Sequence, residues 1–296
     1  MKEKISKAFQ ELQDYITKKL EVLDGKSTFQ EDSWERAEGG GGRTRVITHG
    51  NVFEKGGVNF SAVHGPVSDA MKRQLDLDGS TFFATGVSIV LHPYNPFVPI
   101  MHMNVRYFEM DNGQYWFGGG IDMTPHYVDK TLAGDFHRSL KNVCDQYNPS
   151  YYSHFKKWAD DYFFIPHRNE TRGVGGIFYD RLVAPENSSK EVLLDFALDL
   201  GRLFPELYAH QYHANKAKEF DESNVQWRNL RRGRYVEFNL VHDKGTKFGL
   251  QTGGRIESIL MSLPETASWL YDFIPMPNSP EEKTIELLRE KCVEWI

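Results

Sequence analysis

The side chains best suited to chemistry alternate along an apolar stretch between residues 101 and 108. In a β-strand, alternate residues point to the same face, so His102, Asn104 and Arg106 would share one face. A histidine can transfer a proton, an amide can form hydrogen bonds, and a guanidinium can bind a carboxylate or phosphate. The pattern therefore predicts a face that binds an anionic ligand, although the solvated side of an antiparallel sheet gives the same alternation.

The flanking sequences favour a ligand-binding face over an ordinary solvated one. The run TFFATGVSIVLHP before this strand is equally strand-like and places Ser88 and His92 at the same period of two. The run QYWFGGGID after it ends in three glycines and Asp122. Glycine weakens a strand but lets a ligand approach closely, and binding sites combine apolar walls with a few polar groups. We therefore expect residues 85–125 to form the centre of a site.

Arginines near glycines are a second signal for an anionic ligand. Guanidinium groups bind carboxylates or phosphates through parallel hydrogen bonds, and neighbouring glycines add backbone N–H donors. The arginines of this kind are Arg106, Arg168 and Arg172 before GVGG, the RRGR run at 231–234, and Arg255 after Gly253 and Gly254. Surface charge explains the RRGR run equally well, whereas Arg106 and Arg255 lie in apolar, glycine-containing segments where a solvated charge is less natural. A ligand with more than one acidic group would explain these two.

Four histidines in polar, glycine-rich or strand-end segments are candidate metal ligands: His92, His102, His137 and His167. No pair of them has the i,i+3 or i,i+4 spacing that places ligands on one helix face, and histidine is also common as an acid–base or core residue. The preferred hypothesis is therefore that His102 donates a proton. A divalent metal bound by these histidines is kept only as a candidate.

The composition describes a globular protein of 296 residues with a formal net charge of -6. This charge gives no general attraction to nucleic acid or to an anionic membrane surface. Cys144 and Cys292 fit neither a disulfide framework nor a zinc motif, and no GxSxG, P-loop, HExxH or dinucleotide fingerprint is present. The N-terminal segment lacks the apolar core of a signal peptide, and no window is apolar enough to span a bilayer. We expect a cytoplasmic protein.

Hydrophobic periodicity predicts helices and strands within one domain, residues 1–296. Helical spacing marks residues 1–23, 131–147, 150–164, 188–220 and 279–296. Pro205 is expected to kink or divide the fourth of these helices. Strands are expected at 43–50 and 58–65 as a hairpin, in 81–122, and in 231–273, most clearly at YVEFNLVHD, with a loop at 24–43. The strands are too many for a strict βαβ alternation, so we predict an α+β fold with a largely antiparallel sheet flanked by helices.

Five longer stretches resemble one enzyme family. They are GVSIVLHPYNPFVPIMHMNVRYFE, WFGGGIDMTP, DFHRSLKNVCDQY, HRNETRGVGGIFYD and RRGRYVEFNLVHDKGTKFGLQTGGRIESILMSLP. The five stretches lie between residues 86 and 264, within a resemblance that runs from about residue 39 nearly to the C-terminus, and the N-terminal helix lies outside the strongest match. On these residues the chain resembles the oxygen-dependent coproporphyrinogen III oxidases of haem biosynthesis. The resemblance implies that two propionates of coproporphyrinogen III are oxidatively decarboxylated to vinyl groups, giving protoporphyrinogen IX, with dioxygen as the oxidant.

The resemblance also implies roles for individual residues. His102 would be the proton donor, Asp122 would be the carboxylate facing the pyrrole nitrogens, and Arg106 would assist both binding and catalysis. The residues that would bind the tetrapyrrole are Ser88, Asn104, Val105, Arg106, Gly253, Gly254 and Arg255. No cofactor is required in this family, although in bacterial relatives the histidines matching His92, His102, His137 and His167 are assigned to a divalent metal. The family fold is a flat antiparallel sheet between helical layers, and a homodimer through about residues 235–270 is expected.

One departure from the family pattern concerns IFYDRL, where Arg181 stands in place of the second acid of many members and Asp180 is retained. A role that needs two carboxylates at this point is therefore not expected. Two further functions stay open from the residues alone. One is a histidine–metal oxygenase built on His92 and His102, and the other is a carrier that binds a tetrapyrrole without changing it.

Overall fold

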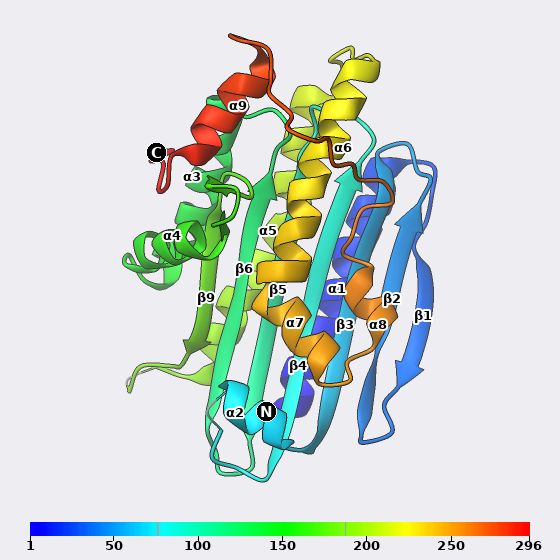
Figure 1. Cartoon of the computed structure of the whole chain (residues 1–296). Helices are drawn as coiled ribbons and strands as arrows, with labels where there is room; N and C mark the ends of the chain where they lie inside the picture. The colour runs from blue at the N-terminus through cyan, green and yellow to red at the C-terminus, as the bar shows by residue number, and fades with distance from the viewer. Residues whose placement is uncertain (76, 187) are drawn as a thin grey trace.

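A seven-stranded sheet forms the centre of the computed structural model, which describes residues 1–75, 77–186 and 188–296 (Figure 1). The strand order within these residues is β1–β2–β3–β4–β5–β6–β9, and each neighbouring pair is antiparallel. The strands are β1 (Gln30–Glu35), β2 (Gly40–Thr48), β3 (Phe53–Pro66), β4 (Thr81–Pro93), β5 (Ile100–Met110), β6 (Tyr115–Thr124) and β9 (Gly176–Leu182). A separate two-stranded ladder joins β7 (Phe164–Ile165) and β8 (Glu170–Thr171).

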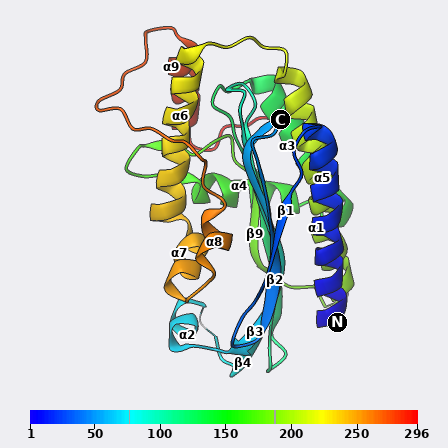
Figure 2. The ribbon, with the colours of Figure 1, turned by 90° about the vertical axis from the view of Figure 1, so that its right-hand side faces the viewer.

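Helices cover both faces of the sheet, as the edge-on view in Figure 2 shows. One layer contains α1 (Lys2–Asp24), α3 (Lys130–Tyr147) and α5 (Lys190–Asn215). The opposite layer contains α2 (Asp69–Leu75), α6 (Glu222–Glu237), the π-helical turn η1 (Phe238–His242), α7 (Lys244–Gln251) and α8 (Ile256–Leu260). The other helices are α4 (Tyr151–Tyr162), which packs on β9, and α9 (Pro280–Arg289). The predicted α+β fold, an antiparallel sheet between helical layers, is confirmed.

The main hydrophobic core lies between the sheet and the layer of α1, α3 and α5. On β5 the odd-numbered residues Met101, Met103, Val105 and Tyr107 are fully buried in this core. The residues that α1 adds to it have helical spacing: Ile5, Phe9, Leu12, Ile16 and Leu20. Because successive side chains of a strand alternate between faces, the even-numbered residues of β5 point to the layer of α6, α7 and α8. The core thereby determines which face of the sheet carries the chemically active side chains.

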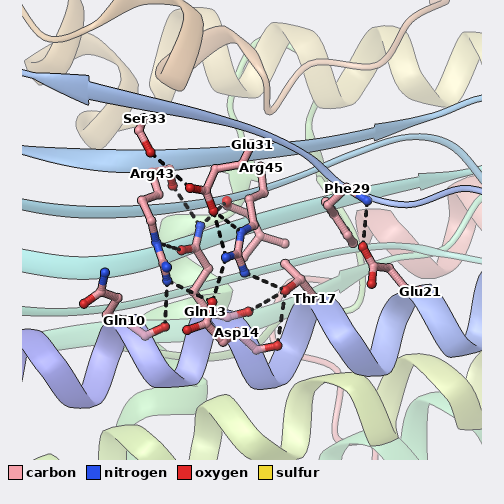
Figure 3. Close-up of polar contacts among 11 residues, drawn as sticks. Gln10, Gln13, Asp14, Thr17, Glu21, Phe29, Glu31, Ser33, Arg43 and Arg45 are labelled. Atoms are coloured by element: carbon pink, nitrogen blue, oxygen red, sulfur yellow. Dashed lines mark hydrogen bonds and ion pairs between the residues drawn. The ribbon is translucent and has the colours of Figure 1, made fainter.

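Polar contacts attach α1 to the edge strands of the sheet (Figure 3). Gln13 is fully buried, donates to backbone carbonyl oxygens of β2 and β3 at 2.8 and 2.9 Å, and accepts from Arg43 Nε at 3.0 Å. Asp14 accepts from Arg43 at 3.0 Å and from Arg45 at 2.7 Å, and Arg45 also donates to Glu31 on β1. These two arginines of β2 therefore hold the helix on the face opposite α6, α7 and α8.

Several elements predicted from periodicity are confirmed. β2 and β3 form the predicted hairpin, and β4, β5 and β6 are the strands predicted in residues 81–122. Asp129 caps α3, and Ser279 caps α9 just before Pro280. α5 runs through Pro205 without interruption, so this proline does not divide the helix, whose buried face packs on α1 and the sheet. None of the helices in the described residues is long and apolar enough to cross a membrane.

The loop predicted at residues 24–43 is wrong in part, because β1 and the first residues of β2 lie within this range. The glycines at 40–42 were predicted to lie in this loop, but they belong to β2 and pair with β1 on one side and with β3 on the other. A Cβ added at Gly42 would lie 2.5 Å from the Trp34 ring on β1. A larger residue at position 42 would collide with the Trp34 ring, so glycine allows this ring to lie against the sheet.

The strands predicted in residues 231–273 are wrong, because α6, η1, α7 and α8 occupy this region. In YVEFNLVHD the buried residues are Tyr235, Phe238 and Asn239, which stand at positions i, i+3 and i+4. This spacing places them on one face of a helix, so the alternation of letters was misleading. A capping box formed by Asp221 and Asn224 starts α6.

Candidate active site

Two neighbouring rows of small and polar residues cross the face of the sheet that lies toward α6, α7 and α8. Directly opposite residues on adjacent strands are in side-chain contact range, so each row forms a continuous strip. The first row is Asp32, Thr44, Asn59, Ser88, Asn104 and Gly120. The second row is Gly42, Ser61, Gly86, Arg106 and Gly118. Ser88, Asn104 and Arg106, predicted separately as ligand-binding residues, are therefore neighbours, and all three are half-buried.

Arg106 is held by two neighbours on this face. Its guanidinium donates to Asn104 Oδ1 at 2.8 Å and to Asp180 Oδ1 at 3.0 Å. The side chains of Arg106 and Asp180 are 37% and 34% exposed, so the pair remains accessible. A Cβ at Gly118 would lie 2.7 Å from both Arg106 Nε and Asp180 Oδ1. The first glycine of GGG therefore provides the space for this ion pair.

The triplet Gly253, Gly254 and Arg255 comes to the same face from the far end of the chain, between α7 and α8. Arg255 pairs with Asp32 on β1 and donates to Ser258 Oγ at 3.1 Å. The Ser258 hydroxyl is in turn 2.7 Å from the hydroxyl of Thr44 in the first row. The structure thus brings the predicted triplet to one end of the first row, with Arg106 beside its other end.

His102 lies beside these rows and is oriented by a buried carboxylate. Its Nδ1 is 2.7 Å from Asp122 Oδ1, and its side chain is 25% exposed, whereas that of Asp122 is 3% exposed. Burial alone would raise the pKa of Asp122, but Arg172 and His102 outweigh it and hold that pKa below its usual value. An ionised Asp122 accepts from Nδ1–H, so Nε2 is the nitrogen of His102 that can exchange a proton with a ligand.

Arg172 completes this set of contacts. It pairs with Asp122 Oδ2 and lies in an aromatic cage formed by Phe163, Tyr235 and Phe238, whose ring centroids are 4.3, 4.7 and 4.6 Å from its guanidinium carbon. The sequence marked Arg172 as an anion-binding candidate because it precedes GVGG. Its anion in the structure is a side chain of the protein. Nothing in the spacing of residues 122 and 172 indicated this pairing.

Most of the other candidate arginines are also paired internally. Arg168 pairs with Glu237 at 2.7 Å, Arg231 pairs with Glu170 at 2.7 Å, and Arg232 pairs with Glu54. Arg231 and Arg232 are buried, so the RRGR run is neither surface charge nor an open anion site. It anchors α6 to the rest of the molecule.

Two further positions named from the family pattern lie away from the polar rows. The side chain of Val105 is fully buried on the opposite face and does not contribute to this face. Arg181 lies 5.0 Å above the ring of Trp116. The ring of Trp116 on β6 stacks on Phe108 of β5, with centroids 4.4 Å apart. Phe108 in turn stacks on Phe82 of β4, with centroids 5.7 Å apart. Arg181 thus belongs to an aromatic border of the face, whereas Asp180 belongs to the ion pair with Arg106.

The four candidate metal histidines have separate environments. His92 Nε2 bonds to the carbonyl oxygen of Ser262, and His137 bonds through one nitrogen to the hydroxyl of Tyr152 and through the other to a carbonyl oxygen. His167 bonds to His242 and Glu237 on η1 and α6. Among the described residues, no group of three or more histidine, cysteine or acidic side chains is placed to hold a metal ion. The structure does not bring these four histidines together.

The sequence of the chain is similar to one protein family and to several of its members. The family model described as "Coproporphyrinogen III oxidase" matches residues 4–295. Coproporphyrinogen-III oxidase 1, chloroplastic, of Arabidopsis thaliana is 47% identical over 96% of this chain and 76% of the relative. The oxygen-dependent coproporphyrinogen-III oxidases, mitochondrial, of Rattus norvegicus and Homo sapiens are 46% and 47% identical, each over 100% of this chain, and over 69% and 67% of their own lengths. The chain therefore belongs to the coproporphyrinogen III oxidase family.

Proposed function

We propose that this protein is an oxygen-dependent coproporphyrinogen III oxidase, which converts two propionates of its substrate to vinyl groups and gives protoporphyrinogen IX. Each conversion breaks the bond to the carboxylate carbon and one C–H bond, and forms one C=C bond. It releases CO2, one proton and two electrons, and dioxygen accepts the electrons. Family membership over residues 4–295, with relatives of this name at 46–47% identity, is the observation that carries the proposal.

The substrate fits the polar rows by size and charge. A porphyrinogen is a broad ring with carboxylates on its rim, and it requires a wide surface with cations at its edges. Neighbouring strands lie about 4.8 Å apart, so Arg106 on β5 and the Asp32–Arg255 pair at β1 are separated by about 19 Å. We assign Arg106 and Arg255 to propionates at opposite edges of the ring. Ser88 and Asn104 lie between them and would contact the ring itself.

His102 is the proposed proton-transfer residue, acting through Nε2. The resemblance assigned Asp122 to the pyrrole nitrogens, but its oxygens bond to His102 and Arg172 and its side chain is almost fully buried. We therefore propose that Asp122 orients His102. His102→Gln should then lower kcat about 100-fold or more with little change in KM, since a positioned acid or base contributes about 10²- to 10⁴-fold. A variant with near-normal kcat would contradict this role.

The decisive test is incubation of the protein with coproporphyrinogen III in air and under nitrogen, followed by product mass. Loss of two carboxyl groups only in air supports the proposal. Binding without any change in mass would identify a carrier instead. A histidine–metal oxygenase remains the second enzyme hypothesis, and it predicts that activity disappears with a chelator and returns with one added metal. Activity unchanged by the chelator supports an enzyme without a required cofactor.

We also propose a homodimer, through the surface formed by η1, α7, α8 and the segment that follows them. This surface exposes apolar side chains that a monomer would leave in water: Leu240, Val241, Leu250, Ile256, Trp269 and Leu270. In sedimentation experiments the protein should behave as a dimer and Ile256→Asp should shift it toward monomer. A monomer at micromolar concentration would contradict the proposal.

We also propose a cytoplasmic location. Residues of α1 are part of the hydrophobic core of the domain. The relatives described above are named as chloroplastic or mitochondrial, so location differs within the family if the proposal is right. Fractionation of source cells with an antibody to the protein would decide between the cytoplasm and an organelle.

A further inference from the structure

We propose that Arg172 is a positioning residue that acts through Asp122 to hold His102 in one tautomer, with Nδ1–H toward Asp122 and Nε2 toward the polar rows. This inference rests on the proposed function, because it gives the proton-transfer residue its orientation. Arg172 itself is too deeply buried to touch a ligand on the sheet, since its side chain is 2% exposed.

Arg172 is buried among one carboxylate and three aromatic rings. A buried guanidinium is unfavourable unless it is paired and hydrogen-bonded. Its ion-pair partner is Asp122, and its other close neighbours are the rings of Phe163, Tyr235 and Phe238. These rings come from the ends of α4 and α6 and from η1, and cation–π attraction adds to the ion pair. The ends of α4 and α6 and the turn η1 therefore fix the position of the guanidinium, and the guanidinium fixes the carboxylate.

The two carboxylate oxygens of Asp122 contact different partners. Oδ1 faces Nδ1 of His102 and Oδ2 faces Arg172, so each oxygen has one partner. Without the guanidinium, Asp122 would be a buried acid with only His102 to compensate its charge, and burial favours the protonated acid. A protonated Asp122 can donate to Nδ1, which would select the tautomer with the proton on Nε2. Arg172 prevents this change of tautomer, because its charge keeps Asp122 ionised and therefore a hydrogen-bond acceptor.

Arg231 is as deeply buried as Arg172 but lies in a different ion pair. It pairs with Glu170 on β8 and not with Asp122 or His102. Removing either arginine takes the nearest guanidinium from a buried acid and leaves it one other partner, His102 for Asp122 and Arg234 for Glu170, so the fold should be destabilised by a similar amount. Only the loss of Arg172 should change His102. Arg231→Gln is therefore a matched control for Arg172→Gln.

The test is the tautomer of His102, measured by ¹⁵N NMR of histidine-labelled protein at one fixed pH, together with kcat and KM. The resonances of His102 are assigned as those missing from His102→Gln. In the wild type the proton should be on Nδ1. In Arg172→Gln it should move to Nε2 in a large part of the molecules, and kcat should fall about 100-fold with KM nearly unchanged. Arg172→Lys keeps a cation beside Asp122 and should recover part of both properties.

Two results would overturn the inference: an unchanged His102 tautomer in Arg172→Gln, or the same change in Arg231→Gln. If Arg172→Gln does not fold, Arg172→Lys and Asp122→Asn provide the comparison, and a wild-type tautomer in Asp122→Asn overturns the inference. The NMR measurement needs no substrate. A wild-type protein that holds His102 as described but does not change coproporphyrinogen III would therefore count against the proposed function alone.

Discussion

Replacing Arg106 with glutamine should raise KM for coproporphyrinogen III and leave the fold intact. Arg106 lies in the second polar row with its guanidinium accessible, and it pairs with Asp180 at 3.0 Å. Glutamine is shorter than arginine, keeps a polar amide on the same stem, and has no charge for a propionate. The substitution therefore removes the charge and the reach of the guanidinium and adds no bulk.

The expected magnitudes follow from the exposure of the pair. Both side chains are more than one third exposed, so their ion pair contributes only about 0–1 kcal/mol to stability. A charge-assisted hydrogen bond to a bound carboxylate contributes about 1.5–3 kcal/mol. Because each 1.4 kcal/mol corresponds to about tenfold, KM should rise about 10- to 150-fold. Turnover at saturating substrate should change less than KM, since the interaction is present before and during the reaction.

The assay is steady-state vinyl formation in air, with urea unfolding as the measure of stability. Arg45→Gln is the matched control, because Arg45 pairs with Asp14 and Glu31 on the opposite face and should leave KM unchanged. Asp180→Asn removes the internal acid that competes for Arg106, so KM should stay the same or fall by up to about fivefold. Unchanged KM and kcat in Arg106→Gln would show that the guanidinium is structural. A tenfold rise in KM for Asp180→Asn would show that Asp180 itself contacts the substrate.

Three further predictions concern stability and space around the site. Asp24 is buried and accepts from five backbone N–H groups, those of residues 26, 27, 51, 52 and 53. The groups of residues 27, 51, 52 and 53 outweigh burial and lower the pKa of Asp24 from 3.8. Asp24→Asn should cost about 1.5–3 kcal/mol in urea unfolding at pH 7. Because the folded pKa is the lower one, the difference from wild type should persist above pH 3.8 and shrink as pH falls through the folded pKa. Gln13→Leu should cost about 1–3 kcal/mol by the same assay, because it leaves buried carbonyl oxygens without a donor, and kcat per folded molecule should not change. Gly118→Ala should displace Arg106 from Asp180 and raise KM, with about 1–3 kcal/mol lost from the crowding, and an unchanged KM would contradict the placement of the pair.

The alternation from Met101 to Phe108 predicted the correct face because that strand is buried on one side only. Met101, Met103 and Val105 are fully buried, and His102, Asn104 and Arg106 are half-buried. Such a strand has a sequence period of two, and this period can be recognised without knowing its neighbours. The register between strands has no such local signal. That Ser88 stands opposite Asn104, and that Asn59 and Thr44 continue the row, is determined by turns and by the packing of the whole sheet.

The C-terminal third shows how the same pattern can mislead. Tyr235, Phe238 and Asn239 are buried at helical spacing, but the exposed apolar residues that follow them, Leu240 and Val241, give the segment a strand-like pattern. An apolar residue in water usually needs no explanation, yet several on one surface indicate a partner. If the proposed dimer covers them, some apolar residues of this segment are buried by the fold of one chain and others by the partner chain. The periodicity of one sequence does not distinguish these two kinds of buried residue.

The arginines show that a guanidinium near glycines does not by itself mark a ligand-binding residue. The ion-pair partners of Arg172, Arg231 and Arg232 are acids of the protein, and these arginines are buried. Arg106 and Arg255 also have acid partners, Asp180 and Asp32, but remain accessible. A ligand with one carboxylate would replace one exposed ion pair by another and gain only the difference between the two interactions. A single macrocycle with carboxylates on opposite edges can engage both arginines after one loss of translational freedom, so the second contact adds to affinity at little further entropic cost. From the proposed roles of Arg106 and Arg255, we infer that their separation across the sheet favours a large polycarboxylate.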